Sequence, residues 1–232
     1  MPDNLLMSVR AIAQRLSGFR PANSRIVKRY LSSANPRKLH LGCGPHPLNG
    51  WLNTDLFCRH GVVYVDVTGR FPFPDEVFDY VYSEHTIEHL PYLGGLNMLL
   101  ESFRVLKPRG KVRFATPDFA FLKGLHNSEK SDLQKAYLSW SLENWVKSGP
   151  VPHPEMFVIN NFVRSWGHQF IYDEATLTDA IRQAGFTGIQ RCALNASEDA
   201  ALSSLENESR MPAGFLKLES LVLEAAKPSA RA

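Results

Sequence analysis

The sequence predicts an α/β fold with seven strands in a mostly parallel sheet, the last strand antiparallel. Short apolar runs rich in β-branched and aromatic residues alternate with stretches of helical periodicity, as a parallel sheet joined by crossover helices requires. The first run ends at a bend with two glycines, Gly42 and Gly44, and the next two runs end at carboxylates, Asp55 and Asp66. Ligands of such sheets bind beyond the carboxyl ends of the strands. These four residues therefore mark the predicted binding edge.

The first apolar run, residues 39–41, connects to the next strand through a short segment. From Gly44 to Asp55 the chain is shorter than the dozen or more residues that a full crossover normally needs. Pro45 and Pro47 also disfavour a helix there. We therefore expect the first crossover helix to be reduced to a turn. Further elements of this half are predicted as strands at residues 51–54, 62–65, 78–82 and 111–115 and a helix at residues 96–106.

The second half begins with a predicted insertion, residues 119–167. Asp173 is expected to cap the N-terminus of a later helix, which Gly185 ends. The other predicted elements of this half are a helix at residues 131–147, an apolar stretch at residues 156–163, and strands at residues 186–192 and 216–225. Between the last two strands, the polar segment 195–210 is expected to be a mobile excursion.

The composition is that of an ordinary globular protein. With 232 residues, the chain is long enough to bury about 70% of its unfolded surface. Hydrophobic residues make up 44% of it, as is usual for globular proteins. No apolar run reaches the roughly 18 residues that span a bilayer, and no signal peptide pattern is present. Three cysteines are too few and too scattered for a disulfide framework or a four-cysteine zinc site. We expect a cytoplasmic protein.

Residues 1–37 form a basic arm ahead of the first strand. Eight Lys or Arg and only one acid, Asp3, lie among residues 1–38, although the whole chain has a formal net charge of only +3. Such an arm could make peripheral contact with an anionic surface; no specific nucleic acid or oligomeric state is predicted. Alternatively, apolar side chains at helical spacing pack a helical pair against the sheet edge. These side chains are Leu5, Val9, Ile12, Leu16, Ile26 and Tyr30.

The order of several sequence landmarks resembles the class I S-adenosylmethionine-dependent methyltransferases, most closely their compact bacterial branch of type 11-like predicted methyltransferases. The landmarks are HLGCG, TD, VDV, FPFPDEVFDYVYSEHTIEHL and FRVLKPRGKVRFATPD. They cover residues 38–118 closely, and residues 167–228 are similar more loosely. The resemblance implies a Rossmann-like fold, S-adenosyl-L-methionine as the cofactor, and methylation of a small-molecule or glycan-type acceptor. Some members lie near cell-surface polysaccharide genes, which suggests a role in that metabolism.

The resemblance also implies a division of the chain. Residues 38–232 form the methyltransferase domain in this interpretation. Its parts are a cofactor half at residues 38–118, a cap-like insertion that binds the acceptor at residues 119–167, and a C-terminal part at residues 168–232. One position departs from the family pattern: His40 stands where the family usually has a first-strand acid, so the usual partner of the methionine amino group is absent from this position.

The predicted cofactor site combines the glycine bend with the two acids. A bend without side chains lets a ligand approach the backbone. Asp55 is expected to accept hydrogen bonds from the ribose hydroxyls, and Asp66 to meet the adenine edge. Alternatively, both acids only cap turns and strand ends. The complete predicted set is Gly42, Cys43, Gly44, Asp55, Leu56, Asp66, Val67 and Ser83.

Residues 83–89, with the sequence SEHTIEH, hold the main catalytic candidates. A base is needed if the acceptor must lose a proton, as a hydroxyl does. His85 is the predicted base, with Glu88 orienting it. On a helix, His85 and His89 would share one face, as would Glu84 and Glu88. The alternative is that Glu88 and His89 only stabilise this helix.

His168 is a second candidate base, because the resemblance suggests that the insertion returns to the acceptor pocket there. Gly167 beside it allows close approach. A core histidine bonded to backbone is the alternative. Asp118, after the fifth strand, is a candidate contact at the pocket rim. Several aromatic residues could form either an acceptor-facing wall or plain core: Trp140, Trp145, Phe157, Phe162 and Trp166.

Two other functions compete with the methyltransferase. His85, Glu88 and His89 match the H-x-x-E-H motif of inverted zinc peptidases, which would make the protein a zinc hydrolase. A milder alternative keeps the methyltransferase and adds a divalent metal near Glu84, Glu88 and His89, although the main interpretation contains no metal. The other competitor is a non-catalytic module that binds S-adenosylmethionine as a sensor.

Overall fold

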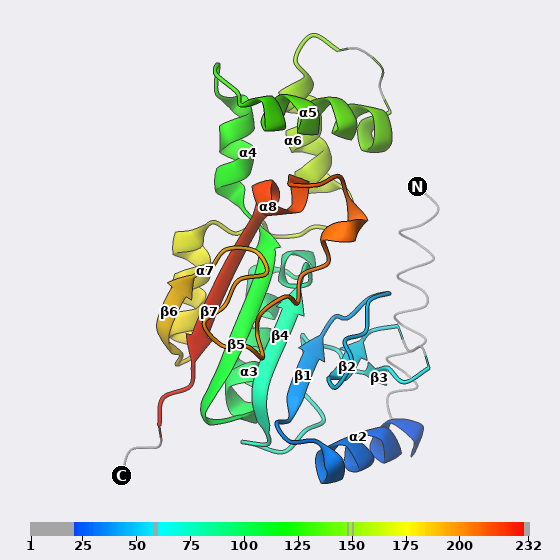
Figure 1. The fold of residues 1–232 in the computed structure, drawn as a ribbon, viewed down its shortest axis with the longest axis vertical. Coiled ribbons are helices and arrows are strands. Elements are labelled where there is room, and N and C mark those ends of the chain that lie inside the picture. The colour runs from blue at the N-terminus through cyan, green and yellow to red at the C-terminus, as the bar shows by residue number, and fades with distance from the viewer. Residues whose placement is uncertain (1–20, 58–59, 148, 150, 230–232) are drawn as a thin grey trace.

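The structure, a computed structural model, describes residues 21–57, 60–147, 149 and 151–229. Its centre is a seven-stranded sheet with the strand order β3-β2-β1-β4-β5-β7-β6 (Figure 1). The strands are β1 (Lys38–Leu41), β2 (Leu52–Asp55), β3 (Val63–Tyr64), β4 (Phe78–Glu84), β5 (Leu106–Pro117), β6 (Thr187–Arg191) and β7 (Ser220–Ala226). The first five are parallel, and β7 runs antiparallel to both β5 and β6. The predicted fold class is confirmed.

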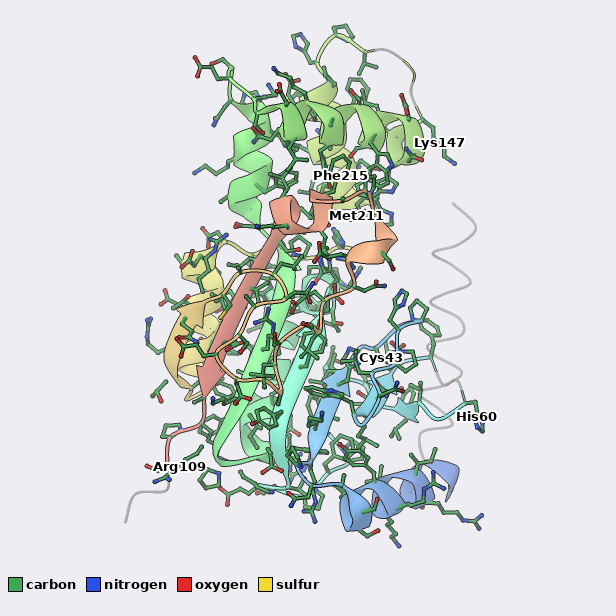
Figure 2. The ribbon with its side chains drawn as sticks, in the orientation of Figure 1. Cys43, His60, Arg109, Lys147, Met211 and Phe215 are labelled. Atoms are coloured by element: carbon green, nitrogen blue, oxygen red, sulfur yellow. The ribbon has the colours of Figure 1, made fainter. Side chains whose placement is uncertain are left out.

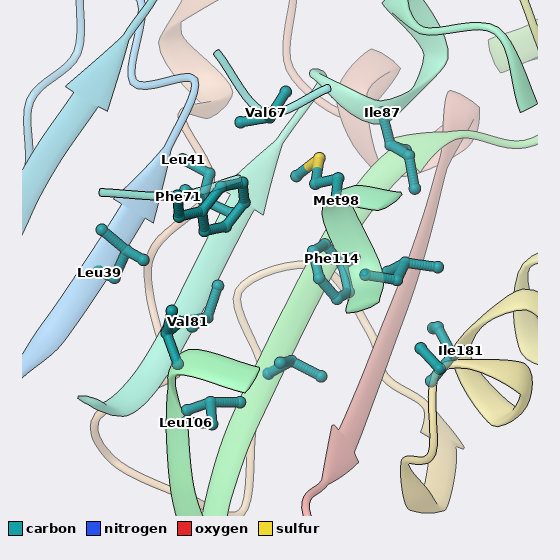
Figure 3. Close-up of a cluster of buried hydrophobic side chains, with 14 of the residues drawn as sticks. Leu39, Leu41, Val67, Phe71, Val81, Ile87, Met98, Leu106, Phe114 and Ile181 are labelled. Carbon is teal, nitrogen blue, oxygen red and sulfur yellow. The ribbon is translucent and has the colours of Figure 1, made fainter. Parts of the chain in front are cut away.

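One face of the sheet is apolar and is covered by helices α3 (Tyr92–Val105) and α7 (Glu174–Gln183). Successive side chains of a strand point to opposite faces, and Leu39, Val81 and Phe114 point to this one. They pack in the same cluster as Met98 of α3 and Ile181 of α7 (Figure 3). All five side chains are at most 1% exposed. This cluster fixes the strand ends that carry the predicted site.

Residue Asp173 caps α7 as predicted. Its side chain accepts a hydrogen bond from the backbone N–H of Thr176, and the helix begins at Glu174. An N-cap of this kind satisfies a donor that has no partner within the helix.

The opposite face of the sheet is polar, and no helix connects β1 to β2. Residues 42–51 form turns, as predicted. This face carries Arg113, which is fully buried and donates to Glu206 and Glu224 at 2.6 Å each. Glu206 belongs to segment 193–210, called the strap below, which also packs Leu202 against Tyr82. The sequence suggested a mobile excursion, but the strap covers the face that the missing crossover helix leaves open (Figure 1).

Helix α2 (Pro21–Ser33) packs against the edge of the core. Ile26 and Tyr30 face inward, and the Tyr30 hydroxyl donates to the carbonyl oxygens of Lys38 and Gly50 at 2.9 and 3.0 Å. For this part of the arm the packing alternative is confirmed. Residues 1–20 of the predicted arm lie outside the described residues, so its contact with an anionic surface stays a prediction.

The insertion forms a helical cap beyond the carboxyl ends of β4 and β5, at the top of Figure 1. Its elements are α4 (Phe119–His126), α5 (Asp132–Ser141), the π-helical segment η2 (Leu142–Val146) and α6 (Pro154–Arg164). They share a second apolar cluster with Phe215 of the short helix α8 (Phe215–Glu219). The predicted helix 131–147 forms as α5 continued without interruption by η2. The predicted strand 216–225 begins instead as α8.

None of the described helices is both long and apolar enough to cross a bilayer.

Candidate active site

The bend after β1 brings bare backbone to the open edge of the sheet. Gly42 and Gly44 have φ values of +66° and +50°, in the left-handed region that favours glycine. A Cβ atom on Gly42 would lie 2.1 Å from the Thr86 hydroxyl oxygen, whereas one on Gly44 would meet nothing within 4 Å. Cys43, between them, lies at the carboxyl end of β1 (Figure 2). The bend therefore packs tightly on one side and faces open space on the other.

A cavity of about 600 Å³, called the β1 cavity below, opens beside this bend. Its volume is within the range of small-molecule sites in proteins. It is lined by His40, Gly42, Cys43, Gly44, Pro45, His46, Pro47, Leu48, Glu84, His85, Leu205, Asn207, Ser209 and Arg210. Three predicted cofactor residues thus line it, together with Glu84 and His85 from the end of β4 and four residues of the strap.

Both predicted cofactor acids cap turns. Asp55 accepts from the backbone N–H groups of Gly44 and Phe57, each at 2.8 Å and each on a different carboxylate oxygen. Asp66 accepts from the backbone and hydroxyl of Thr68 at 3.0 and 2.6 Å. The capping alternative is therefore realised in both. Each carboxylate oxygen of Asp55 has a second lone-pair site, so the predicted contact with ribose hydroxyls stays a prediction compatible with this geometry.

The other predicted cofactor residues do not line the β1 cavity. The Val67 side chain belongs to the apolar core and is 6% exposed, and Leu56 is half-buried. Ser83 is 2% exposed, and its hydroxyl has no hydrogen-bond partner among the described residues. Backbone contacts from Val67 and Ser83 to a cofactor stay predictions.

His40 does not replace the acid that the family usually has on the first strand. Its ring is buried, and its Nδ1 atom lies 3.0 Å from the side-chain oxygen of Asn53. Burial lowers the pKa of His40 to about 4. The ring is therefore neutral at neutral pH and offers no negative charge.

A second cavity of about 300 Å³, the cap cavity, lies beneath the helical cap. It is lined by His85, Glu88, His89, Pro117, Trp145, Phe162, Trp166, His168, Arg210, Met211 and Glu219. Met211 and Phe215 of the same connection lie just below the cap in Figure 2. Three of the five aromatic candidates line this cavity, whereas Trp140 and Phe157 do not. His85 and Arg210 line both cavities, so the two cavities meet there.

The predicted helix at residues 83–89 does not form. β4 extends through Glu84, His85 has a left-handed φ of +46°, and only the single 3₁₀ turn η1 (Ile87–His89) follows. Pro91 forces the preceding Leu90 into an extended conformation, which leaves no room for a longer helix. The prediction that His85 and His89 share a helix face is therefore wrong, as it is for Glu84 and Glu88. The zinc hydrolase loses the helix on which its motif depends.

Glu88 contacts the ring of His85. The His85 Nδ1 atom lies 3.1 Å from one carboxylate oxygen of Glu88. Glu88 is fully buried, and its other carboxylate oxygen accepts a hydrogen bond from the Thr116 hydroxyl at 3.1 Å. Burial alone would raise the pKa of Glu88, but the hydrogen bond and charge of His85 and the charge of His89 hold it below its ordinary value. The other ring nitrogen of His85, Nε2, is buried and has no partner among the described residues. With the proton assigned to Nδ1, Nε2 is a basic atom between the cavities.

His168 lies beside His89 in the cap cavity, at the end of the insertion. Its Nδ1 atom donates to the carbonyl oxygen of Phe162 at 2.6 Å, and the two histidine rings are 4.9 Å apart. Burial lowers the pKa of His168. Ligand atoms of Glu88, His89 and His168 all lie within 4.8 Å of one another. This group differs from the suggested metal set, because Glu84 points instead into the β1 cavity.

Several polar residues of the two cavities were missed by sequence reasoning, among them Arg210, Asn207 and Glu219. Arg210 and Asn207 come from the strap, and Glu219 comes from α8. Burial raises the pKa of Glu219, which accepts a hydrogen bond from Tyr137. No local motif marks these positions, because the long connection between β6 and β7 places them. Asp118, predicted at the rim, instead caps α4 and binds Arg191 at 2.8 Å.

The fold is that of an α/β domain, and a cavity lies beside the glycine bend at the carboxyl edge of its sheet. The chain belongs to the methyltransferase domain family, whose model matches residues 14–191. This confirms the predicted class I methyltransferase family and agrees with S-adenosylmethionine as its cofactor. A comparison of the sequence with curated proteins finds no match.

Solved structures to which the chain is similar include methyltransferases. An S-adenosylmethionine-dependent methyltransferase from Archaeoglobus fulgidus is 15% identical, with 89% of this chain and 93% of that chain covered and a TM-score of 0.48. One from Mesorhizobium loti is also 15% identical, with 84% and 92% covered and a TM-score of 0.48. Phosphoethanolamine N-methyltransferase 2 from Haemonchus contortus, in complex with S-adenosyl-L-methionine, is 16% identical with a TM-score of 0.43. The match covers 90% of this chain but only 52% of that enzyme.

Proposed function

We propose that the protein transfers a methyl group from S-adenosylmethionine to a small-molecule or glycan-type acceptor whose reacting atom must lose a proton. The observation that carries this proposal is His85. Its Nδ1 atom contacts buried Glu88, and its Nε2 atom is unpartnered among the described residues where the two cavities meet. A base oriented by a buried carboxylate between a cofactor cavity and an acceptor cavity suits such a transfer.

The residues of the bend fit the cofactor. Gly44 presents backbone without a side chain to open space, the adjoining cavity has a suitable volume, and Asp55 keeps acceptor sites for hydroxyl groups. Gly42, Cys43 and Gly44 would hold the ribose and methionine part, with Asp55 at the ribose. When bound, S-adenosylmethionine supplies a methyl group activated by a positively charged sulfur.

The protein's own contribution is orientation, exclusion of water and removal of a proton. Orientation of reactants can lower a barrier by on the order of 7–11 kcal/mol. The walls formed by Trp145, Phe162 and Trp166 would exclude water from the cap cavity. His85 would accept the acceptor proton at Nε2, and Glu88 would stabilise the resulting imidazolium.

The lining of the cap cavity supports a polar acceptor with apolar faces, such as a sugar. Aromatic rings can contact the C–H face of a sugar ring, and the carboxylates of Glu88 and Glu219 can accept hydrogen bonds from hydroxyl groups. A role in cell-surface polysaccharide metabolism and a cytoplasmic location belong to this proposal as predictions.

A titration followed by a transfer assay tests the function. The first step is isothermal titration of the protein with S-adenosylhomocysteine, and the second is transfer of a labelled methyl group to cell-envelope extracts. We expect binding and a labelled product that mass spectrometry can identify. Binding without transfer to any acceptor would favour the non-catalytic module. No binding of the nucleoside would contradict the proposal.

A further inference from the structure

The β1 cavity contains a pair of opposite charges that the proposed catalysis does not use. Among the described residues that line it, Glu84 is the one carboxylate and Arg210 is the one guanidinium. Glu84 ends β4, and Arg210 ends the 3₁₀ turn η3 (Glu208–Arg210) of the strap. A carboxylate oxygen of Glu84 lies 3.7 Å from Nη2 of Arg210. A negative and a positive group are thus held side by side at the bend.

Glu84 is well enclosed but only weakly engaged. Its side chain is 13% exposed. Its neutral donors are the backbone N–H of Asn207, at 3.3 and 3.4 Å from the two carboxylate oxygens, and the Tyr82 hydroxyl at 3.4 Å. Hydrogen bonds between an ammonium group and a carboxylate are about 2.7–2.9 Å long. A cationic donor that reached Glu84 would therefore make a shorter and stronger bond than any of these.

We propose that Glu84 and Arg210 together bind the amino-acid end of the methyl donor, Glu84 its ammonium group and Arg210 its carboxylate. This inference rests on the proposed function. Ammonium and carboxylate are carried by one carbon atom of the donor, so adjacent groups of opposite charge are complementary to them. His40 on β1 cannot take the ammonium group, because its Nδ1 atom is engaged by Asn53 and its ring lies buried in the sheet face.

The strap is the element that positions Arg210. Glu206, four residues earlier, binds Arg113 in the sheet through both carboxylate oxygens at 2.6 and 2.9 Å. Asn207 contacts His46 of the bend at 3.2 Å. The connection that replaces the first crossover helix on this face thus also delivers the cation to the bend.

Isothermal titration with two nucleosides tests the proposal. S-Adenosylhomocysteine carries the amino-acid end, and 5′-methylthioadenosine lacks it. We expect Glu84→Gln and Arg210→Gln each to raise the Kd of S-adenosylhomocysteine at least tenfold and to leave the Kd of 5′-methylthioadenosine unchanged. Glu208→Gln is the matched control, because Glu208 lies on the same turn, is exposed and does not line the cavity. Its Kd values should equal those of the wild type.

Decarboxylated S-adenosylhomocysteine, which keeps the amine alone, separates the two roles. Glu84→Gln should weaken its binding, and Arg210→Gln should not. Unchanged Kd values for S-adenosylhomocysteine in both variants, or an equal loss for both nucleosides, would overturn the proposed pair while the cofactor site stands. If the wild type binds neither nucleoside, the proposed function itself fails. Circular dichroism of each variant shows whether it is folded.

Discussion

At the scale of single residues, two histidines at the edge of the β1 cavity differ in their surroundings. The Nε2 atom of His85 has no hydrogen-bond partner among the described residues, and its Nδ1 atom contacts the buried carboxylate of Glu88. His40 has its ring locked in the sheet by Asn53 and is held neutral by burial. We therefore propose a catalytic role for His85 and a role in stability alone for His40. Each assignment predicts a different experiment.

Replacement of His85 by Gln should lower kcat by about 10²–10⁴-fold, the usual contribution of a positioned base. The Kd of S-adenosylhomocysteine should be unchanged, because the variant keeps a polar side chain of similar size. The measurement is kcat for methyl transfer to the acceptor that the transfer assay identifies, from pH 6 to pH 10, at saturating cofactor. The variant should recover activity as the acceptor itself loses its proton at high pH.

The matched control for His85 is His89→Gln. His89 also lines the cap cavity, but its nearest nitrogen is 4.0 Å from Glu88. We expect kcat of this variant to stay within about tenfold of the wild type, because the general base is intact. Equal losses in the two variants would show that His85 is not the specific base.

His40 should make the folded state sensitive to acid. Its pKa is about 4 in the folded protein and 6.5 ordinarily. Below pH 6.5 the unfolded chain binds a proton that the folded chain does not, so the free energy of unfolding falls as the pH drops towards 4. The full shift corresponds to about 3 kcal/mol. Urea unfolding at pH 7 and pH 5 measures the loss, and His40→Asn, which keeps an amide N–H for Asn53, should lose less. An equal loss in both proteins would remove His40 as the cause.

At the scale of elements, the strap covers the sheet face that lacks a crossover helix, and buried charges hold it there. Arg113 is fully buried, and its guanidinium is satisfied by Glu206 and Glu224 together with the carbonyl oxygens of Ala193 and Ala196. A buried pair of this kind contributes little compared with an apolar core, but its disruption leaves uncompensated charge. Loss of one partner in this network should therefore destabilise the folded state.

Replacement of Arg113 by Met should lower the free energy of unfolding by about 3–5 kcal/mol, because two buried carboxylates lose their partner. Urea unfolding measures this change. Addition of Glu206→Gln and Glu224→Gln to the same protein should restore part of the stability. The control is Arg182→Met. The side chain of Arg182 is 63% exposed and pairs with Asp179 on the surface, so this variant should change stability by less than about 1 kcal/mol. Similar losses from the two arginines would contradict the importance of the network.

Local patterns were sufficient for some elements and insufficient for others. The cap at Asp173 and the turn after Gly44 depend on residues within a few positions of each other, and both were predicted. The strap was not, because the partner of Glu206 is 93 positions away in the sequence. The helix expected around His85 does not form, because β4 extends to Glu84 and Pro91 ends the following turn. In the site, the bend and the contact of His85 with Glu88 were predicted, whereas Arg210 was not.

At the scale of the whole molecule, the sheet edge and the helical cap each form one of the two cavities. The β1 cavity belongs to the sheet edge and the strap, and the cap cavity lies between the carboxyl ends of the strands and the helices η2 and α6. The cavities meet at His85 and Arg210. Binding of cofactor and binding of acceptor should therefore be separable by mutations on opposite sides of this meeting point.

Two exposed aromatic residues of the cap test that separation. Trp166 is 44% exposed and lines the cap cavity, whereas Phe157 is 43% exposed and does not. Loss of one aromatic contact costs about 0.5–1.5 kcal/mol, so Trp166→Ala should raise the KM of the acceptor by up to about tenfold. The Kd of S-adenosylhomocysteine should not change. Phe157→Ala should change neither quantity, since its ring is equally exposed but lies outside the cavity. A rise in KM for both variants, or for neither, would place the acceptor elsewhere than beneath the cap.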